Sequence, residues 1–149
     1  MKKIFLSLTL AAALLSSGAT YAANNEPNVK VKQAFTTEFT QVKDVEWIPM
    51  NNEGVYQAKF IFNNETLHAF FTEEGDFLGT TRQILKPQLP ILVATGLEKR
   101  YSDARVITIF EYSKKDGIEY FITLTTAKGS MIVKATGNGD FSTYKKNFK

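Results

Sequence analysis

The side chains of a Cys-His or Ser-His-Asp catalytic site are poorly supplied in this chain. Cysteine is absent and His68 is the only histidine among the 149 residues. A Ser-His-Asp site would have to use His68 as its base, and no serine stands in the Gly-x-Ser-x-Gly context of a nucleophile elbow. We interpret His68 as a solvated or packed strand residue, and we predict no catalytic residues.

Three carboxylates crowd into one turn, Glu73-Glu74-Gly75-Asp76. Carboxylate oxygens at this density can hold a hard cation such as calcium. The turn at the matching place later in the chain, Gly137-Asn138-Gly139-Asp140, keeps only one acid, so we interpret the cluster as a soluble hairpin tip and predict no metal. The other acids offer no pair placed across a sugar-binding groove, and no glycine-rich phosphate loop joins a strand to a helix. The sequence predicts a non-enzyme without cofactors.

These residues lie within a segment that occurs twice. Tyr56 to Phe77 aligns with Tyr120 to Phe141 without a gap, at an offset of 64 positions (120 − 56). A helix-like segment precedes each copy, Val31 to Val42 in the first and Ile91 to Ala104 in the second. Self-similarity of this kind predicts a tandem repeat.

The apolar periodicity predicts one helix and four antiparallel strands in each copy. Spacings of three and four residues indicate a helix, and alternation indicates strands with one buried face. The first copy has a helix from Val29 to about Thr40 and strands at Val45–Ile48, Val55–Phe62, Leu67–Thr72 and Phe77–Arg82. The second has a helix at Ile91–Tyr101 and strands at Arg105–Tyr112, Ile118–Thr126, Ser130–Thr136 and Phe141–Phe148.

Neither copy is large enough to bury a stable core alone. We therefore predict an α+β fold, with one continuous antiparallel sheet of about eight strands and both helices on one face. The residues that meet the helices are predicted to be Tyr56, Ala58, Phe60, Leu67, Ala69, Phe71, Tyr120, Ile122, Leu124, Met131 and Val133.

The first 22 residues have the pattern of a cleavable signal peptide. Lys2 and Lys3 precede the apolar run Ile4 to Leu15, and Thr20-Tyr21-Ala22 supplies the small residues that signal peptidase requires. We predict cleavage after Ala22 and a periplasmic or secreted protein. Residues 23–28 are then a flexible lead, and residues 29–149 form a single domain of two repeats, 29–85 and 89–149. No later apolar stretch is long enough to cross a membrane.

The charge of the predicted mature chain is nearly balanced. Removing Lys2 and Lys3 leaves 16 basic against 15 acidic residues, which disfavours nucleic acid as a partner. The balance differs between the halves: residues 23–85 carry a net −4 and residues 86–149 a net +5. The basic, aromatic end Tyr144 to Lys149 favours an edge strand guarded by lysines, with contact to anionic lipid as the alternative.

The sheet face opposite the helices is the predicted binding site. Large apolar side chains within a polar ring are typical of such a patch. The alternatives are that a loop or the lead Ala23 to Asn28 covers them, or that a register shift places them in the core. The candidate partner-binding residues are Ile61, Phe70, Phe121 and Ile132, with Lys59, His68 and Lys134 in the ring beside Gln57 and Thr123. Trp47 is predicted to pack over the junction of helix and sheet, the alternative being a partner anchor.

A series of aromatic and small residues recurs with similar spacing in the two copies. The first copy contains Phe35-x3-Phe39, Val45-x-Trp47, Tyr56-x-Ala58-x-Phe60, Ala69-x-Phe71 and Gly75, and the second contains Leu89-Pro90, Tyr101, Ile107, Tyr120 and Gly139. In this order and spacing the motifs resemble the exported bacterial PepSY-like proteins, also described as β-lactamase-inhibitor-like (BLIP-like). The chain departs from that pattern at Thr40 and Ser102, where proline is usual, and at Asn63-Asn64, where Asn-Gly is usual.

The resemblance implies a small exported binding domain. The inhibitor after which the family is named grips an enzyme with its open sheet face, and no catalytic residues belong to the pattern. We predict a non-enzymatic domain that binds a protein or peptide, with a possible inhibitor-like role, as a monomer or weak homodimer. The alternatives are a small envelope hydrolase and a structural envelope component without a discrete ligand.

Overall fold

The computed structural model describes residues 26–50 and 54–148. The predicted signal peptide and the start of the predicted lead lie outside this part of the chain. In chain order the elements are α2 (Val29–Glu38), β1 (Val45–Met50), β2 (Val55–Phe62), β3 (Glu65–Thr72), β4 (Phe77–Ile84), the short 3₁₀ helix η1 (Lys86–Gln88), α3 (Ile91–Arg100), β5 (Arg105–Lys114), β6 (Gly117–Thr126), β7 (Gly129–Thr136) and β8 (Phe141–Phe148).

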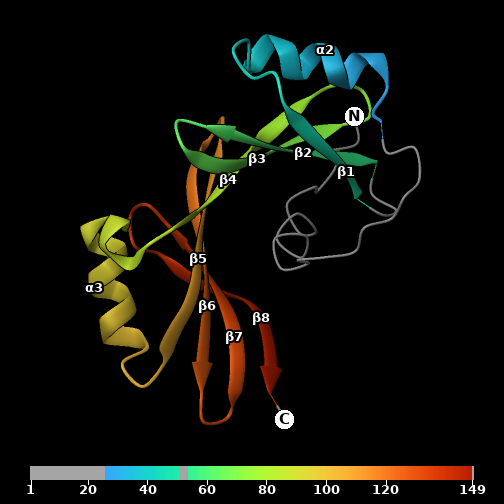
Figure 1. Ribbon diagram of the computed structural model, residues 1–149. Helices are drawn as coiled ribbons and strands as arrows, with labels where there is room; N and C mark the ends of the chain where they lie inside the picture. The colour runs from blue at the N-terminus through green and yellow to red at the C-terminus, as the bar shows by residue number, and fades with distance from the viewer. Residues whose placement is uncertain (1–25, 51–53, 149) are drawn as a thin grey trace.

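The eight strands form one antiparallel sheet in the order β1-β2-β3-β4-β5-β6-β7-β8. Figure 1 shows that the sheet twists so strongly that β1 to β4 and β5 to β8 run in different directions, with α2 over the first group and α3 beside the second. The predicted α+β class, the single sheet and the number of strands are confirmed.

Both helices pack on the same face of the sheet, as predicted. The ladder pairs Ala58 with Ala69, Ala69 with Thr80 and Thr80 with Ser113, so these residues share one face. Alternation along β4 and β5 then places Ile84 and Ile109 on that face too. Val31 and Phe35 of α2 pack against its first half, and Val93 and Leu97 of α3 against its second.

Aromatic rings fill the core beneath α2. The ring centroid of Phe35 lies 5.3 Å from that of Trp47 and 5.3 Å from that of Phe60, both in edge-on contacts. The ring centroids of Phe39 and Phe60 lie 4.8 Å apart. Edge-to-face pairs add to the energy of burial alone. The predicted packing of Trp47 over the helix–sheet junction is confirmed.

The first helix is shorter than predicted and the first strand is longer. Thr36 and Thr37 hydrogen-bond back to the carbonyls of Lys32 and Gln33, and α2 ends at Glu38, two residues before Thr40. β1 continues through Pro49 to Met50. Proline is tolerated there because β1 is an edge strand, where one side of the backbone needs no partner.

The hairpin between β2 and β3 fixes the register of both strands. Asn63 and Asn64 have φ angles of 50° and 64°, which is the left-handed pair of a type I′ turn. Asparagine adopts this conformation more readily than most residues, so Asn-Asn serves where Asn-Gly is usual. Phe62 then pairs with Glu65, and Lys59 pairs with His68.

Two turns repeat the same hydrogen bonds 64 positions apart. In the first, Thr72 N donates to Asp76 O and Gly75 N donates to Thr72 O; in the second, Thr136 N donates to Asp140 O and Gly139 N donates to Thr136 O. Each turn approaches a helix: a Cβ on Gly75 would lie 3.1 Å from Lys30 O, and one on Gly139 would lie 3.0 Å from Leu92 O.

Candidate binding face

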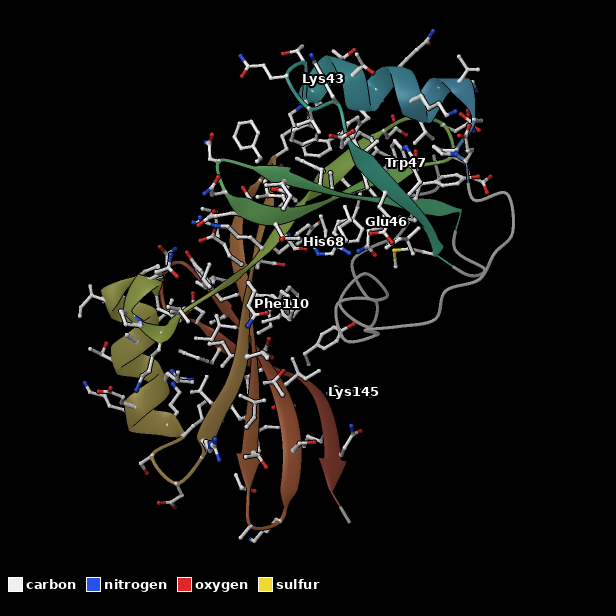
Figure 2. All side chains as sticks on the ribbon, viewed as in Figure 1. Lys43, Glu46, Trp47, His68, Phe110 and Lys145 are labelled. Atoms are coloured by element: carbon white, nitrogen blue, oxygen red, sulfur yellow. The ribbon has the colours of Figure 1, made fainter. Side chains whose placement is uncertain are left out.

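A row of mainly polar residues crosses the face of the sheet that points away from the helices. Cross-strand pairing runs from Glu46 on β1 to Lys59, His68, Thr81 and Tyr112, and then to Glu119 on β6. We call these six residues the polar row. Figure 2 shows Glu46, His68 and Phe110 on the side of the sheet away from α2 and α3, and Trp47 on the side of α2.

Charges are paired at both ends of the polar row. Lys59 Nζ lies 2.8 Å from Glu46 Oε2. At the other end Lys114 Nζ and Lys134 Nζ lie 3.1 and 3.3 Å from the same oxygen, Glu119 Oε1. The first end is therefore neutral, and the second carries one positive charge in excess.

His68 lies between these ends, on β3. Its Nδ1 is hydrogen-bonded to Gln57 Nε2. Burial lowers the pKa of His68 below its ordinary value, and the nearby charge of Lys59 lowers it further, while Glu46 acts in the opposite direction. In a Ser-His-Asp triad the base is oriented by a carboxylate, whereas the partner of His68 is the amide of Gln57, so this geometry is that of a packed histidine.

Thr81 and Tyr112 occupy the middle of the polar row. Thr81 Oγ1 is buried and has no hydrogen-bond partner in the part of the chain that the structure describes. Tyr112 Oη donates to Leu78 O at 2.8 Å. Burial, together with the charge of Glu119, raises the pKa of Tyr112 to about 12, so this hydroxyl stays protonated and continues to donate.

The structure places all seven predicted binding residues on this face, so their predicted register is right. Their predicted exposure is right for Lys59 and for Ile61, which is 67% exposed. The prediction is wrong for Phe70, Phe121 and Ile132, which are 0%, 7% and 7% exposed.

The buried residues have two different surroundings. Phe121 and Ile132 pack with the partly buried Phe110, Tyr112 and Tyr144, and the ring centroids of Phe121 and Tyr144 lie 5.4 Å apart, edge on. We call these five residues the aromatic cluster. Three of its members were not among the predicted site residues, although alternation along β5 places Phe110 and Tyr112 on this face.

Phe70 lies on the first half of the same face. It pairs with Gln57 on one side and Gly79 on the other. A Cβ on Gly79 would lie 2.6 Å from Tyr112 Cε2, so the tyrosine ring occupies the place of the missing side chain. The sheet's own aromatic residues thus fill part of a face that the sequence predicts to be open.

The acidic turn has structural partners. Lys30 forms an ion pair with Glu74 at 2.5 Å, and Asp76 N donates to Thr72 Oγ1. The Glu73 carbonyl accepts from Asn28 Nδ2 at 2.8 Å. Over residues 26–50 and 54–148, no three His, Cys, Asp or Glu side chains gather as a metal site requires. No helix in that same part of the chain is long and apolar enough to span a bilayer.

The chain matches no protein-family model and no curated protein. It does match solved structures.

A DUF2874 family protein from Bacteroides ovatus superposes with a TM-score of 0.70 and 17% identity, over 79% of this chain and 88% of that one. A protein from Bacteroides eggerthii provisionally described as periplasmic has a TM-score of 0.69 and 13% identity, over 79% and 89%. A BLIP-like protein from Bacteroides fragilis has a TM-score of 0.66 and 17% identity, over 78% and 84%. The chain therefore shares the fold of these BLIP-like and DUF2874 proteins, and at such identities the likeness establishes the fold alone.

Proposed function

We propose that this protein is an exported, non-enzymatic domain that binds a protein or peptide on the sheet face opposite the helices. The observation that carries the proposal is the polar row, which runs across six strands beside the aromatic cluster. Aromatic side chains next to positioned polar groups are enriched at binding interfaces. The likeness to a BLIP-like protein supports an inhibitor-like role as one form of this function.

Export follows from the N-terminal pattern. We propose cleavage after Ala22 and a periplasmic or secreted mature chain, which agrees with the provisional description of one structural neighbour. Intact-mass measurement of the exported protein tests this directly. Retention of residues 1–22 would contradict both the cleavage site and the location.

We also propose that the two halves are copies of one unit. The matching hydrogen bonds at Thr72 and Thr136, and the matching approaches of Gly75 and Gly139 to a helix carbonyl, support duplication. Kinship with the PepSY-like proteins is part of the same proposal. A duplicated scaffold suits binding because it presents a wide, continuous surface rather than one enclosed pocket.

The absence of enzymatic activity is part of the proposal. The hydrogen-bond partner of His68 is the amide of Gln57, whereas the base of a Ser-His-Asp triad is oriented by a carboxylate. A small envelope hydrolase is the competing function, and a broad panel of ester, peptide and glycoside substrates separates the two. Turnover that is lost in a His68→Asn variant would overturn the binding-only proposal.

The binding face can be tested with substitutions that leave the core intact. Lys59 and Ile61 are both exposed on β2, so Lys59→Ser with Ile61→Ser should preserve stability and abolish capture of a partner from the envelope fraction. Ile91→Ser with Leu92→Ser is the matched control, because these residues are 73% and 56% exposed on α3, on the other side of the sheet. Equal capture by both variants would exclude this face. No captured protein with any variant would favour a structural envelope component.

A further inference from the structure

The second half of the binding face carries two lysines in adjacent cross-strand pairs. Lys134 on β7 pairs with Phe121 on β6, and Lys145 on β8 pairs with Ile132 on β7. Lys134 and Ile132 are two residues apart on one strand and therefore point to the same side. Two lysine residues thus neighbour Phe121 and Ile132 of the aromatic cluster in the ladder.

The acids of this half leave these lysines with an excess of positive charge. Only Glu111 and Glu119 carry carboxylates within strands β5 to β8, all of which the structure describes. Glu111 lies on the helix side, where it accepts from Arg82 Nε at 2.8 Å. Glu119 is shared by Lys114 and Lys134. Lys145 is exposed and forms no ion pair with the described part of the chain.

The charge distribution along the chain agrees with this local excess. Residues 86–149 carry 11 basic and six acidic side chains, whereas residues 23–85 carry five and nine. Positive charge beside partly buried aromatic rings is complementary to a segment that presents carboxylates next to apolar side chains. A field of this sign also speeds the approach of an acidic partner at low salt.

We propose that this surface docks an acidic segment of a partner protein, with Lys134 and Lys145 binding its carboxylates and the aromatic cluster receiving its apolar side chains. The inference rests on the proposed function and adds to it the chemistry of the partner. The occupant is a protein segment rather than a lipid surface, because the lysines flank a patch of aromatic rings within a sheet and not one face of an amphipathic helix.

The test uses two short, end-capped peptides against the purified protein. One alternates Asp with Phe, and the other alternates Lys with Phe. Backbone amide shifts in NMR titrations report both affinity and site. The acidic peptide should bind with a dissociation constant tighter than about 1 mM and shift the amides of Phe121, Ile132 and Lys134, while the basic peptide should not bind. Raising NaCl from about 0.05 M to about 0.5 M should weaken binding several-fold.

Matched variants separate local contact from overall charge. The double substitution Lys134→Gln with Lys145→Gln should raise the dissociation constant of the acidic peptide by about 5- to 10-fold. The control variant, Lys115→Gln with Lys128→Gln, removes the same charge from two exposed residues outside the strands. Its affinity for the acidic peptide should stay within about 2-fold of that of the wild type.

The other outcomes each contradict the inference. Equal binding of both peptides at this face would leave the proposed function standing but exclude acidic selectivity. Equal weakening by the two double variants would show a diffuse field and no docking site. Binding to anionic phosphatidylglycerol vesicles but not to the acidic peptide would make lipid the occupant, and salt-sensitive dimerisation without peptide binding would make a second copy the occupant. Absence of peptide binding would overturn the inference, while loss of partner capture on substituting Lys59 and Ile61 would still support the proposed function.

Discussion

Gly79 is required at its position for two physical reasons. Its φ angle is +143°, a conformation that other residues rarely adopt, and a Cβ there would lie 2.5 Å from the backbone oxygen of Ser113. Gly117 has a similar φ of +135° but nothing within 4 Å of the same position. A comparison of the two glycines therefore separates backbone strain, which both positions have, from steric overlap, which only Gly79 has.

We expect Gly79→Ala to lower the free energy of unfolding by about 3 kcal/mol or more, and Gly117→Ala by about 1–2 kcal/mol. Urea denaturation of both variants measures the difference. Equal decreases in the free energy of unfolding would mean that backbone strain accounts for the whole effect. The overlap with Ser113 would then be relieved by a small movement of β4 relative to β5 that costs no stability.

His68 should make the stability of the folded protein depend on pH in the acid range. Its pKa is lowered in the folded state by burial and by Lys59, so below about pH 6.5 the unfolded chain binds a proton that the folded chain does not. The contribution is therefore present above that pH and is lost as the pH falls through the folded pKa. Because His68 is the only histidine, a His68→Asn variant isolates this term.

The expected result is a smaller decrease in the urea midpoint of His68→Asn than of the wild type between about pH 7 and about pH 5. Carboxylates contribute equally to both proteins and cancel in the comparison. Identical pH profiles would show that His68 becomes protonated in the folded protein as easily as in the unfolded one.

At the scale of elements, the start of α2 is held by one asparagine with two roles. Asn28 Oδ1 accepts from Val31 N at 3.1 Å as the N-cap, and Asn28 Nδ2 donates to Glu73 O at 2.8 Å. The first bond satisfies a free amide of the helix, and the second ties the helix to the turn after β3. α3 has no equivalent, since its N-cap Pro90 makes no side-chain bond.

Asn28→Ala should therefore cost about 1–2 kcal/mol of stability, and Asn28→Ser about half as much, because serine keeps the cap but does not reach Glu73. Chemical denaturation of the two variants gives both values. If the serine and alanine variants lose the same amount, the bond to Glu73 carries the whole effect and the cap carries none.

The elements themselves could be predicted from the sequence because each depends on local pattern. β2 alternates from Tyr56 to Phe60 and ends at an Asn-Asn turn, and its predicted bounds, Val55–Phe62, match the structure. The exposure of the binding face could not be predicted in this way. It depends on how closely the rings of β5, β6 and β8 pack together, and on a shift in pairing near Ile132 and Val133 that accompanies the placing of Tyr144 beside Phe121.

At the scale of the whole molecule, the continuous sheet couples the two cores. Phe60 is 3% exposed and packs against Phe35 and Phe39, so Phe60→Ala should lower stability by about 3–5 kcal/mol. Because β4 and β5 are joined by a ladder of five residue pairs, from Thr80 with Ser113 to Ile84 with Ile109, we expect the second half to unfold with the first.

Fluorescence of Trp47 and far-UV circular dichroism should then give one coincident transition in the variant and in the wild type. Ile61→Ala, on the same strand but 67% exposed, should leave the midpoint nearly unchanged. Two separated transitions would show that the halves are independent domains.

The strand order has a consequence for the speed of folding. Each strand pairs only with the strands next to it in the sequence, and each helix packs mainly against strands of its own half. Sheets are usually slow to form because distant segments must meet before any contact rewards the loss of chain entropy. In this protein neighbours in the sheet are also neighbours in the sequence, so the chain can form one hairpin after another, and only the pairing of β4 with β5 has to close the longer loop that contains α3.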